Sequence, residues 1–178
     1  MILKPNLIFL VFALIALSVF APKAKRDLSV FDEGGTKGQE AMPETQTRGF
    51  WTDPSTKLTW AAKDSGKGLS YKGAVKYCRG LRLAGHADWR LATLAELQDI
   101  YDKTANAPGL AGPHGKDPFQ WHVKGNLFLT DYEWAYDPSG TVGNRQKVFN
   151  FNEGRSNIES SGFWSSSRRA LCVRGPGK

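Results

Sequence analysis

The chain has 178 residues, of which 40% are hydrophobic and 23% charged, and its formal net charge is +7. This length leaves room for one domain with extensions, and the composition is that of a globular protein. The positive charge alone would suit nucleic acid, but the export signal described next disfavours a nucleic-acid partner.

The first 21 residues differ from the rest of the chain. Lys4 precedes an almost unbroken apolar run over 7–20, and the basic segment 22–26 follows it. This order predicts a secretory signal peptide at 1–21, and the run is short for a membrane span, which needs about 20 apolar residues. An uncleaved anchor in the inner membrane is the alternative. Either way we expect an exported protein that is periplasmic or extracellular.

Residues 22–47 predict a flexible polar linker. The segment has little apolar periodicity and contains Gly and Pro, so it offers too little apolar surface to offset the entropy lost on ordering. The folded domain is therefore expected over 48–178.

Two short strands open this domain in the prediction. They cover 50–52 and 57–60, and the turn between them contains Asp53 and Pro54, which favour a tight chain reversal.

Two helices follow. Ser70 is suited to cap a helix whose apolar side includes Ala74 and Cys78. Thr93 and Glu96 form a capping box, which predicts a second helix immediately after Thr93.

The remaining sequence predicts long loops and a few strands. Pro and Gly residues interrupt the pattern over 105–143, although 127–129 is an apolar strand candidate within it. Residues 147–151 alternate and predict another strand, and 163–166 is expected to form a closing hairpin with 171–174. Strands, two helices, long loops and strands again indicate an α+β fold with short antiparallel strands.

The two cysteines, Cys78 and Cys172, are expected to pair if the protein is exported, because disulfides persist in oxidising compartments. Such a bond would join residues 94 positions apart and close a loop of nearly the whole domain. A free thiol or an intermolecular bond is the alternative.

Several motifs together resemble one known family. They are 51–60, 74–78, 88–93 with Glu96 and Leu97, 163–166, and 172–174. In this order they are similar to the family named for the C-terminal domain of the Legionella collagen-like adhesin (Lcl), over about 48–174. Ala92 departs from the pattern, since the family usually has Pro at that position.

The resemblance implies a C-type-lectin-like fold, in which a cysteine of the first helix pairs with one in the last strand. It also implies an exported bacterial protein. The named adhesin is associated with sulfated glycosaminoglycans and with cell attachment.

The sequence predicts neither catalysis nor a cofactor. It has no Gly-x-Ser-x-Gly nucleophile motif, and the pairing of both cysteines would leave none for the chemistry of formylglycine-generating enzymes, which share the lectin-like topology. The triplet Asp88, Trp89 and Arg90 is expected to be structural, with Trp89 in the core and its neighbours tying loops together.

No metal site is predicted either. His114, Asp117 and His122 share one loop without the spacing of a zinc site. Asn150, Asn152 and Glu153 offer oxygen ligands, with Asp131, Glu133 or Asp137 as further donors, but the sugar-binding calcium motifs of C-type lectins are absent.

The distribution of charge along the chain says more about a ligand than the candidate metal sites do. From Arg145 to Lys178 the chain has seven basic residues and two acids, which accounts for +5 of the net +7. The planar guanidinium group of arginine can donate two parallel hydrogen bonds to a sulfate, phosphate or carboxylate group. The candidate ligand-binding cations are Arg145, Lys147, Arg155, Arg168 and Arg169. The aromatic residues of the preceding loop, Trp121, Tyr132, Trp134 and Tyr136, offer rings that could stack on sugar, and Trp121, Trp134 and Tyr136 are taken as candidate site residues. An ordinary solvated basic surface, and rings that only pin the loop, are the alternatives.

We therefore expect a non-enzymatic module that binds an anionic, sulfated polysaccharide or a cell-surface partner. A structural component of an envelope complex, with the aromatic loop as its protein interface, is the second hypothesis. The salt dependence of binding distinguishes the two hypotheses, because added salt screens charges and weakens ionic binding.

Overall fold

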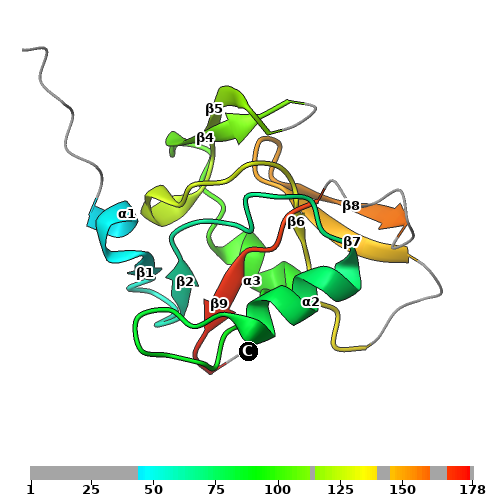
Figure 1. Ribbon diagram of the computed structural model, residues 1–178. Coiled ribbons are helices and arrows are strands. Elements are labelled where there is room, and N and C mark those ends of the chain that lie inside the picture. Colours follow the sequence, from blue (N-terminus) through cyan, green and yellow to red (C-terminus); the bar gives the residue numbers. More distant parts are fainter. Residues whose placement is uncertain (1–43, 113–114, 140–144, 161–167, 177–178) are drawn as a thin grey trace, which may run out of the picture. The chain divides into compact units, whose positions relative to one another are not determined.

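The computed structural model describes residues 44–112, 115–139, 145–160 and 168–176 (Figure 1). The expected signal peptide or anchor at 1–21 lies outside these ranges. No helix within them is long and apolar enough to cross a membrane.

The described elements are short helices and antiparallel strands, which confirms the α+β class. In chain order they are α1 (Glu44–Arg48), β1 (Phe50–Thr52), β2 (Thr59–Ala61), α2 (Tyr71–Gly80), β3 (Arg90–Leu91), α3 (Leu94–Asp99), β4 (Ala107–Ala111), β5 (Asp117–Trp121), the 3-10 helix η1 (Lys124–Asn126), β6 (Glu133–Trp134), β7 (Arg145–Asn150), β8 (Arg155–Ser160) and β9 (Cys172–Arg174). Helix α1 begins within the segment expected to be linker.

A four-stranded sheet joins the two ends of the domain. Its order is β1-β2-β9-β3, so the last strand, red in Figure 1, lies between β2 and β3. The strand predicted at 50–52 is confirmed as β1, and the strand predicted at 57–60 is present as β2, which begins two residues later, at Thr59. In the predicted closing hairpin, 163–166 lies outside the described residues, and β9 pairs with β2 and β3.

Both predicted helix starts are confirmed. Ser70 caps α2 by accepting a hydrogen bond from the backbone of Gly73. The side chain of α2 residue Cys78 faces inward and forms a disulfide with Cys172 of β9, with a Cα–Cα distance of 5.4 Å. The expected disulfide is therefore present and ties the first long helix to the last strand.

The capping box is also present. Thr93 accepts from the Glu96 backbone, and the Glu96 carboxylate accepts from the Thr93 backbone at 2.9 Å. Burial raises the pKa of Glu96, but hydrogen bonds from Arg90 and Thr93 more than offset it, so that the pKa is lowered overall. Arg90 holds the same carboxylate through two hydrogen bonds of 2.8 and 2.6 Å, and Asp88 pairs with Arg174. These contacts, with buried Trp89, confirm the structural role expected for 88–90.

We expect Thr93→Ala to destabilise the domain by about 1 kcal/mol, because a helix N-cap is lost. Urea unfolding followed by circular dichroism measures the change. Thr104→Ala is the matched control, since the Thr104 hydroxyl bonds only to exposed-loop Asp102. Equal effects of the two substitutions would contradict a capping contribution.

The region 105–143 contains more regular structure than predicted. Strands β4 and β5 form a two-stranded hairpin. Pro108 and Pro118 fit within it because each strand of such a ribbon has an outer edge that needs no hydrogen-bond ladder. The strand predicted at 127–129 is wrong, since Phe128 makes only an isolated bridge to Lys63.

A third sheet, β6-β7-β8, confirms the strand predicted near 147–151 and completes the fold. Two buried clusters hold these layers together. One contains Trp60 and Phe149, and the other contains Cys78 and Trp89 beside Trp134 of β6. Helix α2 therefore buries its apolar side against β3, β6 and β7 and turns its polar side to solvent.

Candidate functional site

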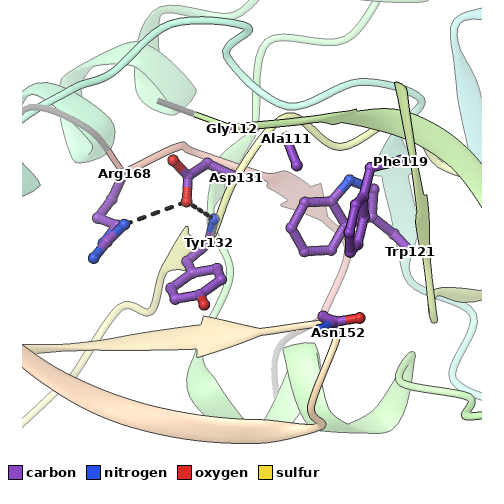
Figure 2. Close-up of a pocket in the computed structure, with 8 residues that line it drawn as sticks. All are labelled: Ala111, Gly112, Phe119, Trp121, Asp131, Tyr132, Asn152 and Arg168. Atoms are coloured by element: carbon purple, nitrogen blue, oxygen red, sulfur yellow. Dashed lines mark hydrogen bonds and ion pairs between the residues drawn. The ribbon is translucent and has the colours of Figure 1, made fainter. Parts of the chain in front are cut away.

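A pocket of about 370 Å³ lies where four parts of the chain meet (Figure 2). One wall consists of the rings of Phe119 and Trp121, which come from β5. The opposite wall contains Tyr132, Asp131 and Arg168. The remaining lining residues are Asn152, in the turn between β7 and β8, and the small residues Ala111 and Gly112.

The β4–β5 hairpin positions the aromatic wall. The Trp121 indole donates to the carbonyl of Leu110 at 3.2 Å, and its ring centroid lies 4.8 Å from that of Phe119. A Cβ at Gly109 would collide with the Trp121 indole and with the carbonyl of Leu129. Glycine at this position therefore lets the indole approach the backbone of its partner strand closely.

Arg168 on the polar wall is paired with two acids through its terminal nitrogens. Its guanidinium pairs with Asp131 at 3.3 Å and with Glu159 at 2.8 Å, and it lies 4.8 Å from the ring centroid of Tyr132. Asp131 Oδ1 also accepts the Tyr132 backbone N–H at 2.6 Å. Two carboxylates thus face one guanidinium, so the charge around Arg168 does not favour an anion.

The structure changes the interpretation of the other predicted arginines. Arg155 forms an ion pair with Glu153. Arg169 is only 4% exposed, and its Nε donates to Thr130 Oγ1 at 2.6 Å in the interior. The prediction that Arg169 contacts a ligand at the surface is therefore corrected: its side chain belongs to the core.

The aromatic residues predicted to stack on sugar lie in different surroundings in the structure. Trp134 is fully buried, donates to the carbonyl of Leu69 at 2.8 Å and packs edge-on against Tyr71. It pins the chain and is corrected from ligand-stacking to core. Trp121 is 2% exposed and presents its remaining surface to the pocket of Figure 2. Tyr136 is half-buried and lies elsewhere.

A second pocket, of about 250 Å³, brings Tyr136 together with Lys147. Arg145 and Lys147 are exposed and alternate with buried residues along β7, so they share one face of the strand. Among the residues described by the structure, neither forms an ion pair. Of the five predicted cations, these two are therefore the ones available to an anionic ligand.

A stronger basic surface lies on α2 and was missed by the sequence-based prediction. Lys72, Lys76 and Arg79 are exposed and follow the i, i+4, i+7 spacing of one helix face. Lys67 and Arg82 are exposed at either end of the helix. We name these five residues the α2 stripe. None of them forms an ion pair with any residue in the described ranges.

The amino-acid composition of the segment around α2 could have revealed the α2 stripe. No Asp or Glu occurs anywhere from Ser65 to Ala87. In contrast, the C-terminal basic run contains Glu153 and Glu159, and both are paired with arginine.

Asp64 and Glu133 form a buried acidic pair. Asp64 accepts from the Thr130 backbone at 2.5 Å and from its hydroxyl, and Glu133 is fully buried next to it. Burial and the neighbouring Asp64 raise the pKa of Glu133 well above its usual range, although Arg169 opposes the shift. Both Glu133 oxygens lack a donor among the described residues. A protonated Glu133 would donate a hydrogen bond to Asp64, and this bond is one of the causes of the raised pKa.

The comparison with known families agrees with the motifs. The model of the Lcl C-terminal domain matches residues 49–174. The chain belongs to this family. The match includes both pockets, the α2 stripe and the disulfide, while a search of curated proteins found no match.

Within the described part of this Lcl C-terminal domain, no group of three or more His, Cys, Asp or Glu side chains is placed to hold a metal ion. His114, one of the weighed ligands, lies outside the described residues. Asn150 instead shapes the β7–β8 turn, because its side-chain oxygen accepts the Asn152 backbone N–H at 2.9 Å.

Proposed function

We propose that this protein is an exported, non-enzymatic binding module that recognises an anionic, sulfated polysaccharide through the α2 stripe. Membership of the Lcl C-terminal domain family suggests an adhesin-like module. The observation that carries the choice of ligand is the row Lys72, Lys76 and Arg79, exposed on one helix face with no neighbouring acid in sequence.

The contrast between paired and unpaired cations supports this location. Arg155, Arg168 and Arg174 each face a carboxylate within 4 Å, which neutralises them locally. The stripe cations have no such partner in the described ranges. A helix rises 1.5 Å per residue, so the three residues on α2 span about 10 Å, a length that an extended polyanion can follow.

Lys147 of β7 is also part of the proposed anion-binding surface. Asp137 interacts electrostatically with both Tyr71 at the start of α2 and Lys147 of β7. This places Lys147 near the N-terminal end of the helix. Arg145 and Lys147 are therefore proposed to extend the anion-binding surface beyond α2.

The disulfide also supports two further proposals, which concern export and the type of fold. A disulfide suggests an oxidising environment, and the apolar run in 7–20 supports export to the periplasm or beyond. The bond from α2 to β9 agrees with the pairing implied for a C-type-lectin-like fold, which we propose for this domain.

We expect the variant Lys72→Gln/Lys76→Gln/Arg79→Gln to bind immobilised heparin about tenfold more weakly, because three exposed charge contacts are each worth about 0.5 kcal/mol. Salt elution from a heparin column, followed by titration calorimetry, measures the loss. The wild-type interaction should weaken as the salt concentration rises.

The matched control is Lys57→Gln/Lys103→Gln/Lys116→Gln, which removes the same charge from exposed positions elsewhere. It should elute close to the wild type. If both triple variants elute together, net charge alone explains retention and the α2 site is wrong.

A further inference from the structure

We infer that the pocket of Figure 2 binds one uncharged sugar ring of a polysaccharide. The inference is independent of the α2 stripe, because it concerns a different surface and a different kind of contact. It also assigns a ligand class to the residues that line this pocket, which have no part in the proposed binding of an anion by the α2 stripe.

The shape and composition of the pocket support a small amphipathic ligand. Its volume of about 370 Å³ is near the lower end for ligand sites, which span about 300–1,000 Å³. Figure 2 shows the Phe119 and Trp121 rings on one side, with Asn152 below them, and Asp131, Arg168 and Tyr132 on the other side. A pyranose has this same division, with C–H groups on its faces and hydroxyl groups around its edge.

The polar wall offers hydrogen-bonding groups suited to hydroxyls. Oδ1 of Asp131 is occupied by Arg168 and the Tyr132 backbone, which fixes the carboxylate in place. Its other oxygen remains an acceptor. The Asn152 side chain is exposed and adds a donor and an acceptor at the pocket rim. Hydroxyl groups around the edge of a sugar ring are suited to such donors and acceptors.

The local charge argues that the ligand is neutral. Arg168 is shared between Asp131 and Glu159, so carboxylates outnumber the cation at this wall. A sulfate or carboxylate would have to displace one of these ion pairs and would be repelled by the other acid. A hydroxylated ring can bind without breaking either pair.

The test uses the full chain and a panel of neutral hexasaccharides built from glucose, mannose, galactose or N-acetylglucosamine. Saturation-transfer NMR at high salt detects weak binding, and titration then gives the affinity. At least one neutral hexasaccharide should bind with little dependence on salt. Phe119→Ala should weaken that binding about tenfold, through the lost ring contact, and Asn152→Ala about fivefold, through one lost hydrogen bond.

Asn157→Ala is the matched control, since Asn157 is exposed on β8 and does not line the pocket. It should bind as the wild type does. Asn152→Ala also guards against a folding effect of Phe119→Ala, because it removes only exposed side-chain atoms. The triple variant of the α2 stripe should keep its neutral-sugar binding, which separates the two proposals.

The inference would be overturned if no neutral hexasaccharide binds, or if only a sulfated heparin hexasaccharide occupies the pocket. Unchanged binding by both Phe119→Ala and Asn152→Ala would also overturn it.

Discussion

Replacing Cys78 and Cys172 together by alanine is expected to lower the free energy of unfolding by about 2–5 kcal/mol. The disulfide joins residues 94 positions apart and connects α2 to β9. Without it the unfolded chain gains conformational freedom over nearly the whole domain. Urea unfolding of the oxidised wild type and of the double variant measures the difference.

Reduction provides the control for this prediction. Dithiothreitol should shift the wild-type midpoint toward that of the double variant and leave the variant itself unchanged. Both sulfur atoms are buried, so the wild type should lose its bond slowly under native conditions. Equal stability of the oxidised wild type and the double variant would show that packing alone holds α2 on β9.

Local signals predicted the elements that depend on adjacent residues. The cap at Ser70 and the capping box of Thr93 and Glu96 involve side chains within three positions of their partners. Their hydrogen bonds form wherever the helix begins, so the sequence alone is sufficient. The α+β class followed from the same elements and their order.

Long-range contacts account for most of the corrected site residues. Arg168 pairs with Asp131, which is 37 positions away, and Trp134 donates to a carbonyl 65 positions away. No local pattern distinguishes an arginine that meets a carboxylate in the fold from one that remains free. The C-terminal basic run therefore looked more available than it is.

The β4–β5 hairpin was missed for a different reason. Pro108 and Pro118 normally end a strand, because they cannot donate to a ladder. In a two-stranded ribbon each strand needs donors on one edge only, and both prolines fit. This hairpin supplies the aromatic wall of the candidate sugar pocket, so the sequence also missed the site that depends on it.

The second large effect concerns the buried acidic pair. We expect Glu133→Gln to remove most of the loss of stability that the wild type shows as the pH rises above the usual carboxyl range. Glutamine keeps the shape of the side chain, and its amide can donate to Asp64 as a protonated Glu133 does. Below that range the variant should match the wild type within about 1 kcal/mol.

The sign follows from proton binding. Burial and Asp64 raise the pKa of Glu133 in the folded protein, while the unfolded chain ionises at the ordinary value. Between these two values the folded state holds a proton that the unfolded state has lost, so rising pH favours unfolding. Burial raises the pKa of Asp64 as well, in the same direction. Arg169 opposes the shift and Asp131 adds to it, whereas Tyr77 remains neutral nearby.

Urea unfolding of both proteins from acidic to alkaline pH measures the effect. The gap in favour of Glu133→Gln should widen as the pH rises and then level off once Glu133 has ionised. Glu153→Gln, at an exposed ion pair, should run parallel to the wild type, because such pairs contribute little. If Glu133→Gln also ran parallel, Glu133 would be ionised in the fold and Arg169 would be its full counter-charge.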